Sequence, residues 1–237
     1  MSRSEATTKP RSSSSVPASP GQASASDPLA VQRGVYSSDL SGGKLLLAAF
    51  RAIAGPLQWL IITSHPLSYF GVPDPPTGTG DAASVSFLKN LGLDHSRLPT
   101  LSVLMALMPT ILGLKHIIWV IFLGREKMTV QFGLFGGLAD TIYEAITSLV
   151  FTAAAVNPMF SPLLVYVGFV TYVSAVAVEL LCEIQRDRFK KDPRNKGRIC
   201  DRGLWGVVRH PNYTANIIFG FSYGLAAGGF GYALATG

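Results

Sequence analysis

The stretch between Glu183 and Asn216 reads EIQRDRFKKDPRNKGRICDRGLWGVVRHPNYTAN. It carries nine basic residues against four acidic ones, a difference that makes up nearly all of the chain's formal net charge of +6. Apolar segments of membrane-spanning length lie directly before and after it. A basic block in this position is suited to hold an anion at a membrane surface. The simpler interpretation is a loop whose positive charge only sets the orientation of the chain.

The composition of the whole chain is typical of a membrane protein that crosses the bilayer several times. Of its 237 residues, 48% are hydrophobic and only 14% are charged. A membrane-spanning helix needs about 20 apolar residues. We therefore predict an all-α bundle of about five transmembrane helices over residues 42–237. The expected spans are residues 45–63, 99–123, 130–156, 160–181 and 213–235. Because Arg51 and Gly55-Pro56 interrupt the first span, we expect it to be kinked, tilted or partly re-entrant.

The N-terminal segment, residues 1–41, is rich in Ser, Pro and Ala and has no apolar run that resembles the core of a signal peptide. It cannot bury enough surface to offset the entropy lost on ordering, so we predict a disordered tail. A transit peptide is the alternative, because Arg3, Lys9 and Arg11 lie among serines. Glu5 and the early prolines argue against it.

The distribution of Lys and Arg predicts the orientation of the bundle. If the N-terminus is cytosolic, sixteen of the twenty basic residues fall on the cytosolic side, together with the basic block. Lys89 and Arg97 are the two on the opposite side. This asymmetry obeys the positive-inside rule. We expect an integral membrane protein, in the endoplasmic reticulum, with its N-terminus and basic loop in the cytosol. Cys182 and Cys200 have no metal-ligand spacing, and we predict neither a disulfide nor a metal site.

The basic block has chain-breaking residues and a specific residue order that a loop needed only for orientation does not require. Its elements are, in order, Glu183, Gln185 and Arg186, then Phe189, Asp192 to Gly197, Gly203 to Trp205, and Arg209 to Tyr213. This series resembles the C-terminal signature of the steroid 5-alpha-reductase and sterol-reductase superfamily, especially its DUF1295-type branch. The resemblance covers the last quarter to third of the chain. Two departures are Asn216, where family members commonly carry an acid, and the end of the chain one span after the motif, where relatives usually continue.

The resemblance implies an NADPH site in the loop at residues 183–213. The bases of the block can meet the phosphates of the cofactor, and no Gly-x-Gly-x-x-Gly turn is present for a Rossmann domain. Pro211 is well placed at a helix start, where backbone N–H groups point at an anion. The alternative for that element is a capped, basic helix entry. The expected cofactor-binding residues are Glu183, Gln185, Arg186, Lys190, Asn195, Gly197, Trp205, Arg209, His210, Asn212 and Tyr213.

A second candidate group lies inside the third expected span. Asp140, Tyr143 and Glu144 have the spacing of one helix face. Acids within a span are costly and usually face a bundle interior or a polar cavity. Reduction of a double bond needs a proton donor opposite the hydride, and a Tyr beside a carboxyl group is suited to that role. The alternative is structural: Asp140 and Glu144 pair with Lys115, His116 or Arg51 to hold the bundle together.

These observations favour a membrane oxidoreductase that reduces a carbon-carbon double bond of a lipid, sterol-like or enoyl, with NADPH. A related branch of methyltransferases carries a similar Arg-His-Pro element and binds S-adenosylmethionine, so lipid or isoprenylcysteine-type methyl transfer is the second hypothesis. The third is a non-catalytic membrane protein that contacts anionic lipid. We expect a lipid substrate and the membrane as partners and no nucleic acid, because the spans already explain the charge of the block.

Overall fold

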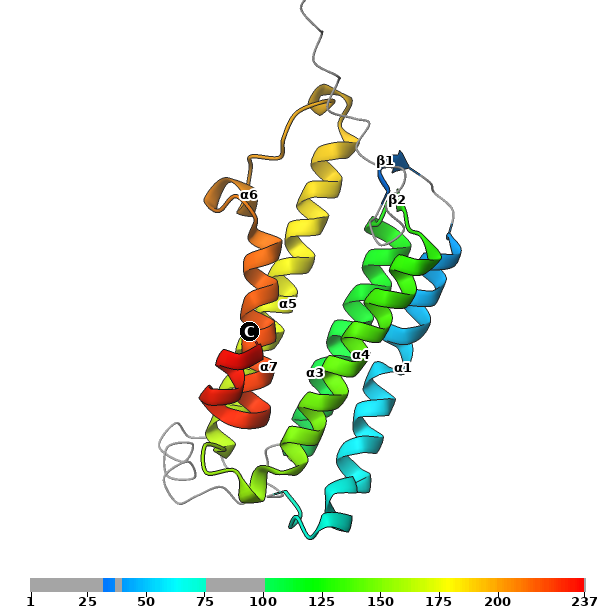
Figure 1. The fold of residues 1–237 in the computed structure, drawn as a ribbon. Helices are drawn as coiled ribbons and strands as arrows, with labels where there is room; N and C mark the ends of the chain where they lie inside the picture. Colours follow the sequence, from blue (N-terminus) through cyan, green and yellow to red (C-terminus); the bar gives the residue numbers. More distant parts are fainter. Residues whose placement is uncertain (1–31, 37–39, 76–100, 237) are drawn as a thin grey trace, which may run out of the picture.

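The computed structural model describes residues 32–36, 40–75 and 101–236. Five of its helices are long and apolar enough to cross a membrane, which confirms the predicted helical bundle (Figure 1). They are α1 (Gly42–Ser64), α3 (Leu101–Ile118), α4 (Val130–Thr152), α5 (Pro162–Lys191) and α7 (Pro211–Thr236). Short helical segments join or extend them: η1 (Pro66–Phe70), η3 (Trp119–Leu123), η4 (Ala154–Val156), η5 (Pro193–Asn195) and α6 (Leu204–Val207).

The helices pack as two groups that meet along the bundle axis. α1 packs mainly against α3 and α4, and α5 packs mainly against α7, while contacts of α3 with α5 and of α4 with α7 join the groups. A buried cluster around Met105, Met108, Phe151, Tyr172 and Tyr223 forms the core between them. Small residues permit close approach, as at Gly168, where an added Cβ would lie 2.7 Å from the carbonyl oxygen of Ser222.

We call the end of the bundle where α5 ends and α7 begins the basic end; it is at the top of Figure 1. α1 and α4 also start there, and α3 ends there. The strand β1 (Gln32–Tyr36) pairs antiparallel with β2 (Glu126–Lys127) at the same end. Lys44 donates to the carbonyl oxygen of Gly124 at 2.6 Å, which ties the start of α1 to the α3–α4 connection.

Two helices differ from the expected spans. α5 continues to Lys191 rather than ending near residue 181, because Glu, Gln, Arg and Lys are good helix formers although they are too polar for a hydropathy signal. The helix α7 breaks at Gly229, whose φ of 78° and ψ of −171° are not helical. The last turns then fold back, so that Gly224 faces Ala233 and Thr236. The continuous helix therefore covers residues 211–228, about 27 Å.

The first and third spans agree more closely with the expectations. α1 is one helix through Pro56, and α4 ends at Thr152 with the 3₁₀ turn η4 after it. β1 lies within the segment for which disorder was expected, and its pairing with β2 supplies the order there. The remainder of that tail, residues 1–31 and 37–39, lies outside the described residues, as do residues 76–100 with Lys89 and Arg97.

Candidate functional site

Several residues of the motif fix the α5–α7 connection to α5. The side-chain oxygen of Gln185 accepts a hydrogen bond from the backbone N–H of Leu204 at 3.0 Å. The indole N–H of Trp205 donates to the carbonyl oxygen of Cys182 at 2.9 Å. Gly203, with a φ of 61°, lies so close to Gln185 that an added Cβ would meet the amide oxygen at 2.6 Å. Together these contacts dock α6 on the side of α5.

The far part of the connection is fixed in the same way. Asn195 is buried and its amide donates to the carbonyl oxygen of Phe189 at 3.1 Å. Lys190 Nζ donates to the carbonyl oxygen of Arg198 at 2.9 Å, and Gly197 makes its turn at a φ of 78°. Arg194 pairs with Asp192 across this turn, and its hydrogen bonds lower the pKa of the Asp192 carboxyl group. A direct contact of these residues with a cofactor stays a prediction.

Glu183 is the buried centre of the site. Its carboxylate is 6% exposed although it lies beside the basic connection. Oε2 accepts from the indole N–H of Trp119 at 3.3 Å and lies 3.2 Å from the guanidinium of Arg186, which also stacks 5.8 Å from the ring centre of Trp205. Oε1 has a longer contact, 3.4 Å, with the amide of Asn212 at the start of α7. The carboxylate thus joins η3, α5 and α7, and Arg186 extends the cluster to α6.

Two hydrogen-bond acceptors at this centre are not fully satisfied by the described residues. At 3.4 Å the contact of Glu183 Oε1 with Asn212 is near the limit for a hydrogen bond. The buried Oδ1 of Asn212 has no hydrogen-bond partner among the described residues. An unpaired buried acceptor costs free energy unless a ligand or water donates to it. The pair is therefore suited to accept hydrogen bonds from a cationic donor.

One turn deeper lies a second carboxylate, that of Glu179. It forms an ion pair with Lys115 of α3, and both side chains are buried. In the amide orientation that pairs donors with acceptors, Asn216 Nδ2 lies 3.2 Å from both oxygens of Glu179. Asn216 is nevertheless exposed on the surface of the bundle. An acid at position 216 would face Glu179 directly, which gives a physical reason for an amide there.

The start of α7 forms the rim of the site. Arg209, His210 and Tyr213 are all exposed. The rings of His210 and Tyr213 lie 5.5 Å apart, and the carbonyl oxygen of His210 accepts the first hydrogen bond of the helix from Thr214 N–H at 3.1 Å. Pro211 occupies the first helical position, as expected from its missing N–H.

The second candidate group is separate from this rim and forms an ion-pair cluster. Glu144 is 2% exposed and its Oε1 lies 2.6 Å from Arg51 of α1. Asp140 lies 3.4 Å from the same guanidinium and 3.9 Å from His116. Tyr143 donates its hydroxyl to the carbonyl oxygen of Gly220 at 3.1 Å. This geometry favours the structural alternative; proton transfer by these residues stays a prediction.

Three residues of the site were not among the expected cofactor-binding or catalytic residues. Lys115 comes from α3, Trp119 from η3, and Glu179 precedes Glu183 by one helical turn. Lys115 and Glu179 did carry a signal, because charged residues within a span usually face a polar interior. Trp119 carried none, since a Trp near the end of a span is most often an interfacial anchor.

Comparison of the sequence with known proteins assigns the chain to a family. A family model described as a protein of unknown function, DUF1295, matches residues 129–235, which include α4, α5 and α7. A probable O-methyltransferase, ustE of Ustilaginoidea virens, is 32% identical over 217 residues, covering 86% of this chain and 74% of the relative. The chain belongs to the DUF1295 family. No solved structure matches it.

For this DUF1295 protein, the match includes both Glu183 and Asn212. It leaves out α1, α3 and η3, which contribute Arg51, Lys115 and Trp119, respectively. The similarity to the O-methyltransferase extends over most of the chain and therefore beyond the family model.

Proposed function

We propose that this protein transfers a methyl group from S-adenosylmethionine to an oxygen atom of an apolar substrate that reaches it from the membrane. The proposal rests on two hydrogen-bond acceptors at the basic end, Oε1 of the buried Glu183 carboxylate and Oδ1 of Asn212. The first has only a long contact, and the second has no hydrogen-bond partner among the described residues. The similarity to a probable O-methyltransferase supports the same chemistry.

The charge of the site suits a cationic cofactor better than a phosphorylated one. S-adenosylmethionine carries a sulfonium and an ammonium group, and a buried carboxylate stabilises positive charge. NADPH instead brings phosphates, which need free cations. Of the bases expected to bind them, Arg186 lies against Glu183, and Lys190 donates to a backbone carbonyl. The deeper carboxylate, Glu179, would oppose an anion as well.

The residues of this chain fit the cofactor in defined roles. Glu183 and Asn212 would hold the ammonium group, and Arg186 lies close enough to them to meet a carboxylate. The bound cofactor supplies an electrophilic methyl group on sulfur. His210, exposed on the rim beside Tyr213, is the side chain best placed to take a proton from a hydroxyl acceptor. The surrounding helices keep the polar site next to the bilayer, where an apolar substrate concentrates.

Thermal unfolding of the purified full-length protein in lipid tests the proposal against reduction with NADPH. A ligand that binds the folded state raises the melting temperature, by a free energy of about 2.7 kcal/mol at 100 times Kd. We expect S-adenosylmethionine to stabilise the protein and NADPH to leave it unchanged. Stabilisation by NADPH alone would favour the reductase hypothesis, and stabilisation by neither would favour the non-catalytic one. Transfer of a labelled methyl group into an extracted lipid fraction then tests the reaction itself.

A further inference from the structure

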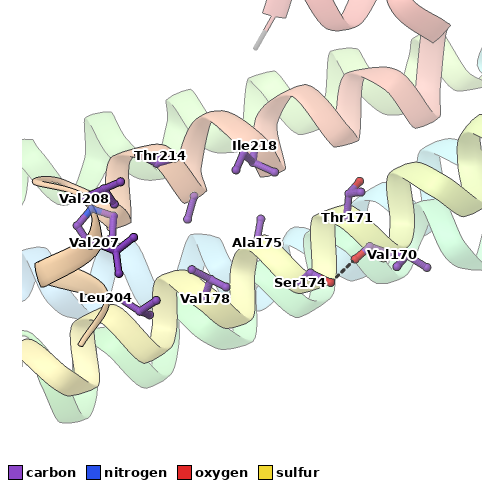
Figure 2. Close-up of a pocket in the computed structure, with 12 residues that line it drawn as sticks. Val170, Thr171, Ser174, Ala175, Val178, Leu204, Val207, Val208, Thr214 and Ile218 are labelled. Atoms are coloured by element: carbon purple, nitrogen blue, oxygen red, sulfur yellow. Dashed lines mark hydrogen bonds between the residues drawn. The ribbon is translucent and has the colours of Figure 1, made fainter.

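A groove on the outer face of the bundle is not used by the proposed reaction. It lies between α5, α6 and α7 and has a volume of about 350 Å³, within the size range of ligand pockets. Figure 2 shows its walls: Val170, Ser174 and Val178 on α5, Val207 and Val208 at α6, and Ile218 on α7. Several of these side chains are exposed, Val170 to 63% and Val207 to 79%, so the groove opens sideways.

The lining of the groove is almost entirely apolar. Its hydroxyl groups are turned to backbone carbonyls: Ser174 donates to Val170 O at 2.8 Å, and Thr214 donates to His210 O at 3.3 Å. Thr171 likewise donates to Val167 O at 2.9 Å. Because these hydrogen bonds use the hydroxyl protons, the walls favour an apolar chain over a polar group.

The groove is separated from the candidate site by the packing seam of α5 and α7. Ala175 and Ala215 on the floor are 5% and 2% exposed. Counted around each helix at 3.6 residues per turn, the groove residues fall on one side of these alanines and Glu183 and Asn212 on the other. An occupant of the groove therefore comes from the bilayer and does not pass through the polar site.

The position of the groove along α5 places its open end, or mouth, at the membrane surface. Residues 162–182 of α5 extend for about 31 Å, which is the thickness of the hydrocarbon core. α6 docks at Cys182 and therefore lies near the headgroup boundary. Two exposed bases flank the lining residues at this level: Arg202 precedes Gly203 and Leu204, and Arg209 follows Val208. A cation near an anionic lipid surface contributes about 1 kcal/mol.

We propose that the groove between α5, α6 and α7 binds one acyl chain of an anionic phospholipid, whose headgroup lies at Arg202 and Arg209. The apolar walls require a hydrocarbon chain, and the bases at the mouth require a negative head. By filling the space under Leu204 and Val207, the chain holds α6 against α5 and so supports Trp205 and Arg186 beside Glu183. This inference does not depend on the identity of the cofactor.

Binding is tested with the full-length protein in neutral detergent, with phosphatidylglycerol and phosphatidylcholine of identical chains as probes. We expect phosphatidylglycerol to raise the melting temperature by several degrees more than phosphatidylcholine. Ser174→Trp fills the groove from an exposed position and should weaken phosphatidylglycerol binding about tenfold. Ala177→Trp, on the exposed part of α5 outside the groove, is the matched control and should bind as the wild type does.

The charge at the mouth is tested by Arg202→Gln combined with Arg209→Gln, with Lys127→Gln on β2 as the control. The double variant should lose the preference for phosphatidylglycerol and keep the weaker binding of phosphatidylcholine. A photoreactive diazirine in the acyl chain of phosphatidylglycerol should label the wild type within residues 170–178 or 211–218. Labelling elsewhere, equal stabilisation by both lipids, or unchanged binding by folded Ser174→Trp would overturn the proposal.

Discussion

At the basic end, the candidate site depends on single side chains that reach from one helix to another. Glu183 touches residues of α5 and α7 and of η3, the continuation of α3. Glu179 is matched by Lys115, whereas one oxygen of Glu183 keeps only a long contact. Glu179 is therefore part of a structural ion pair, whereas Glu183 is a candidate binding group.

The charge of Glu183 can be removed with little change of shape. We expect Glu183→Gln to weaken the affinity for S-adenosylmethionine about 10- to 100-fold, because a hydrogen bond to a charged group contributes about 1.5–3 kcal/mol. Titration of the full-length protein by calorimetry measures the change. Glu126→Gln on β2 is the matched control and should bind normally. Equal affinities for the two variants would contradict the assignment of Glu183.

Arg51 and Glu144 form a buried pair whose partners depend on each other. Arg51→Met leaves the carboxylate of Glu144 without its closest partner and should destabilise the protein by about 3–5 kcal/mol. Combining it with Glu144→Met should recover most of that loss, since both charges are then gone and Asp140 remains partly exposed. Unfolding of the wild type, both single variants and the double variant in mixed micelles gives the coupling. A double variant as unstable as Arg51→Met would rule out this pairing as the source of the loss.

At the scale of elements, two features of the last two helices shape the site. α5 carries Glu183 and Gln185 past the apolar segment without leaving its helix, and Asn212 enters from the first turn of α7. The break at Gly229 then lets residues 230–236 fold back, with Tyr232 Oη 3.1 Å from Thr147 Oγ1 of α4. The break therefore anchors α7 against the other helix group.

Gly229 holds this break by its backbone. Its φ of 78° is strained for other residues, and an added Cβ would overlap the carbonyl oxygen of Met159. We expect Gly229→Ala to destabilise the protein by about 2 kcal/mol or more, measured by thermal unfolding. Gly220→Ala lies in the regular part of α7 with nothing near the added carbon, so it should be neutral or stabilising by up to about 1 kcal/mol. Identical stabilities of the two variants would argue against the strain.

At the scale of the whole molecule, the basic residues of the described segments gather at one end of the bundle. The basic end gathers the basic connection, β1, β2 and the starts of α1 and α4, whereas Tyr69 and Phe70 at the other end are 89% and 84% exposed (Figure 1). This asymmetry has the form that the positive-inside rule associates with a cytosolic basic end.

Orientation can be measured with introduced cysteines, because Cys182 and Cys200 are both buried. In sealed microsomes with the cytosolic face outward, Lys196→Cys should react with a membrane-impermeant maleimide at once. Phe70→Cys, at the opposite end, should react only after the membrane is opened. The reverse pattern would place the basic end, and with it the candidate site, in the lumen.

The sequence by itself determined the number and approximate limits of the membrane helices, because burial in lipid requires long apolar runs that hydropathy detects directly. It also located the connection with Glu183 and Asn212, since turn residues and charge stand out between such runs. Lys115 was named as a partner of Asp140 or Glu144 in the structural alternative, whereas its pairing with Glu179 was not predicted.

Only the tertiary structure decided how those residues are used. It turned the side chains of Asn195 and Trp205 toward carbonyl groups of α5, and that of Gln185 toward the backbone N–H of Leu204. It also brought Trp119 to Glu183, and Arg51 to Asp140 and Glu144. These pairings join helices far apart in the chain, and helix packing, rather than local propensity or hydropathy, sets which side chains meet. The break at Gly229 belongs with them, because its backbone is fixed by close contact with the carbonyl group of Met159.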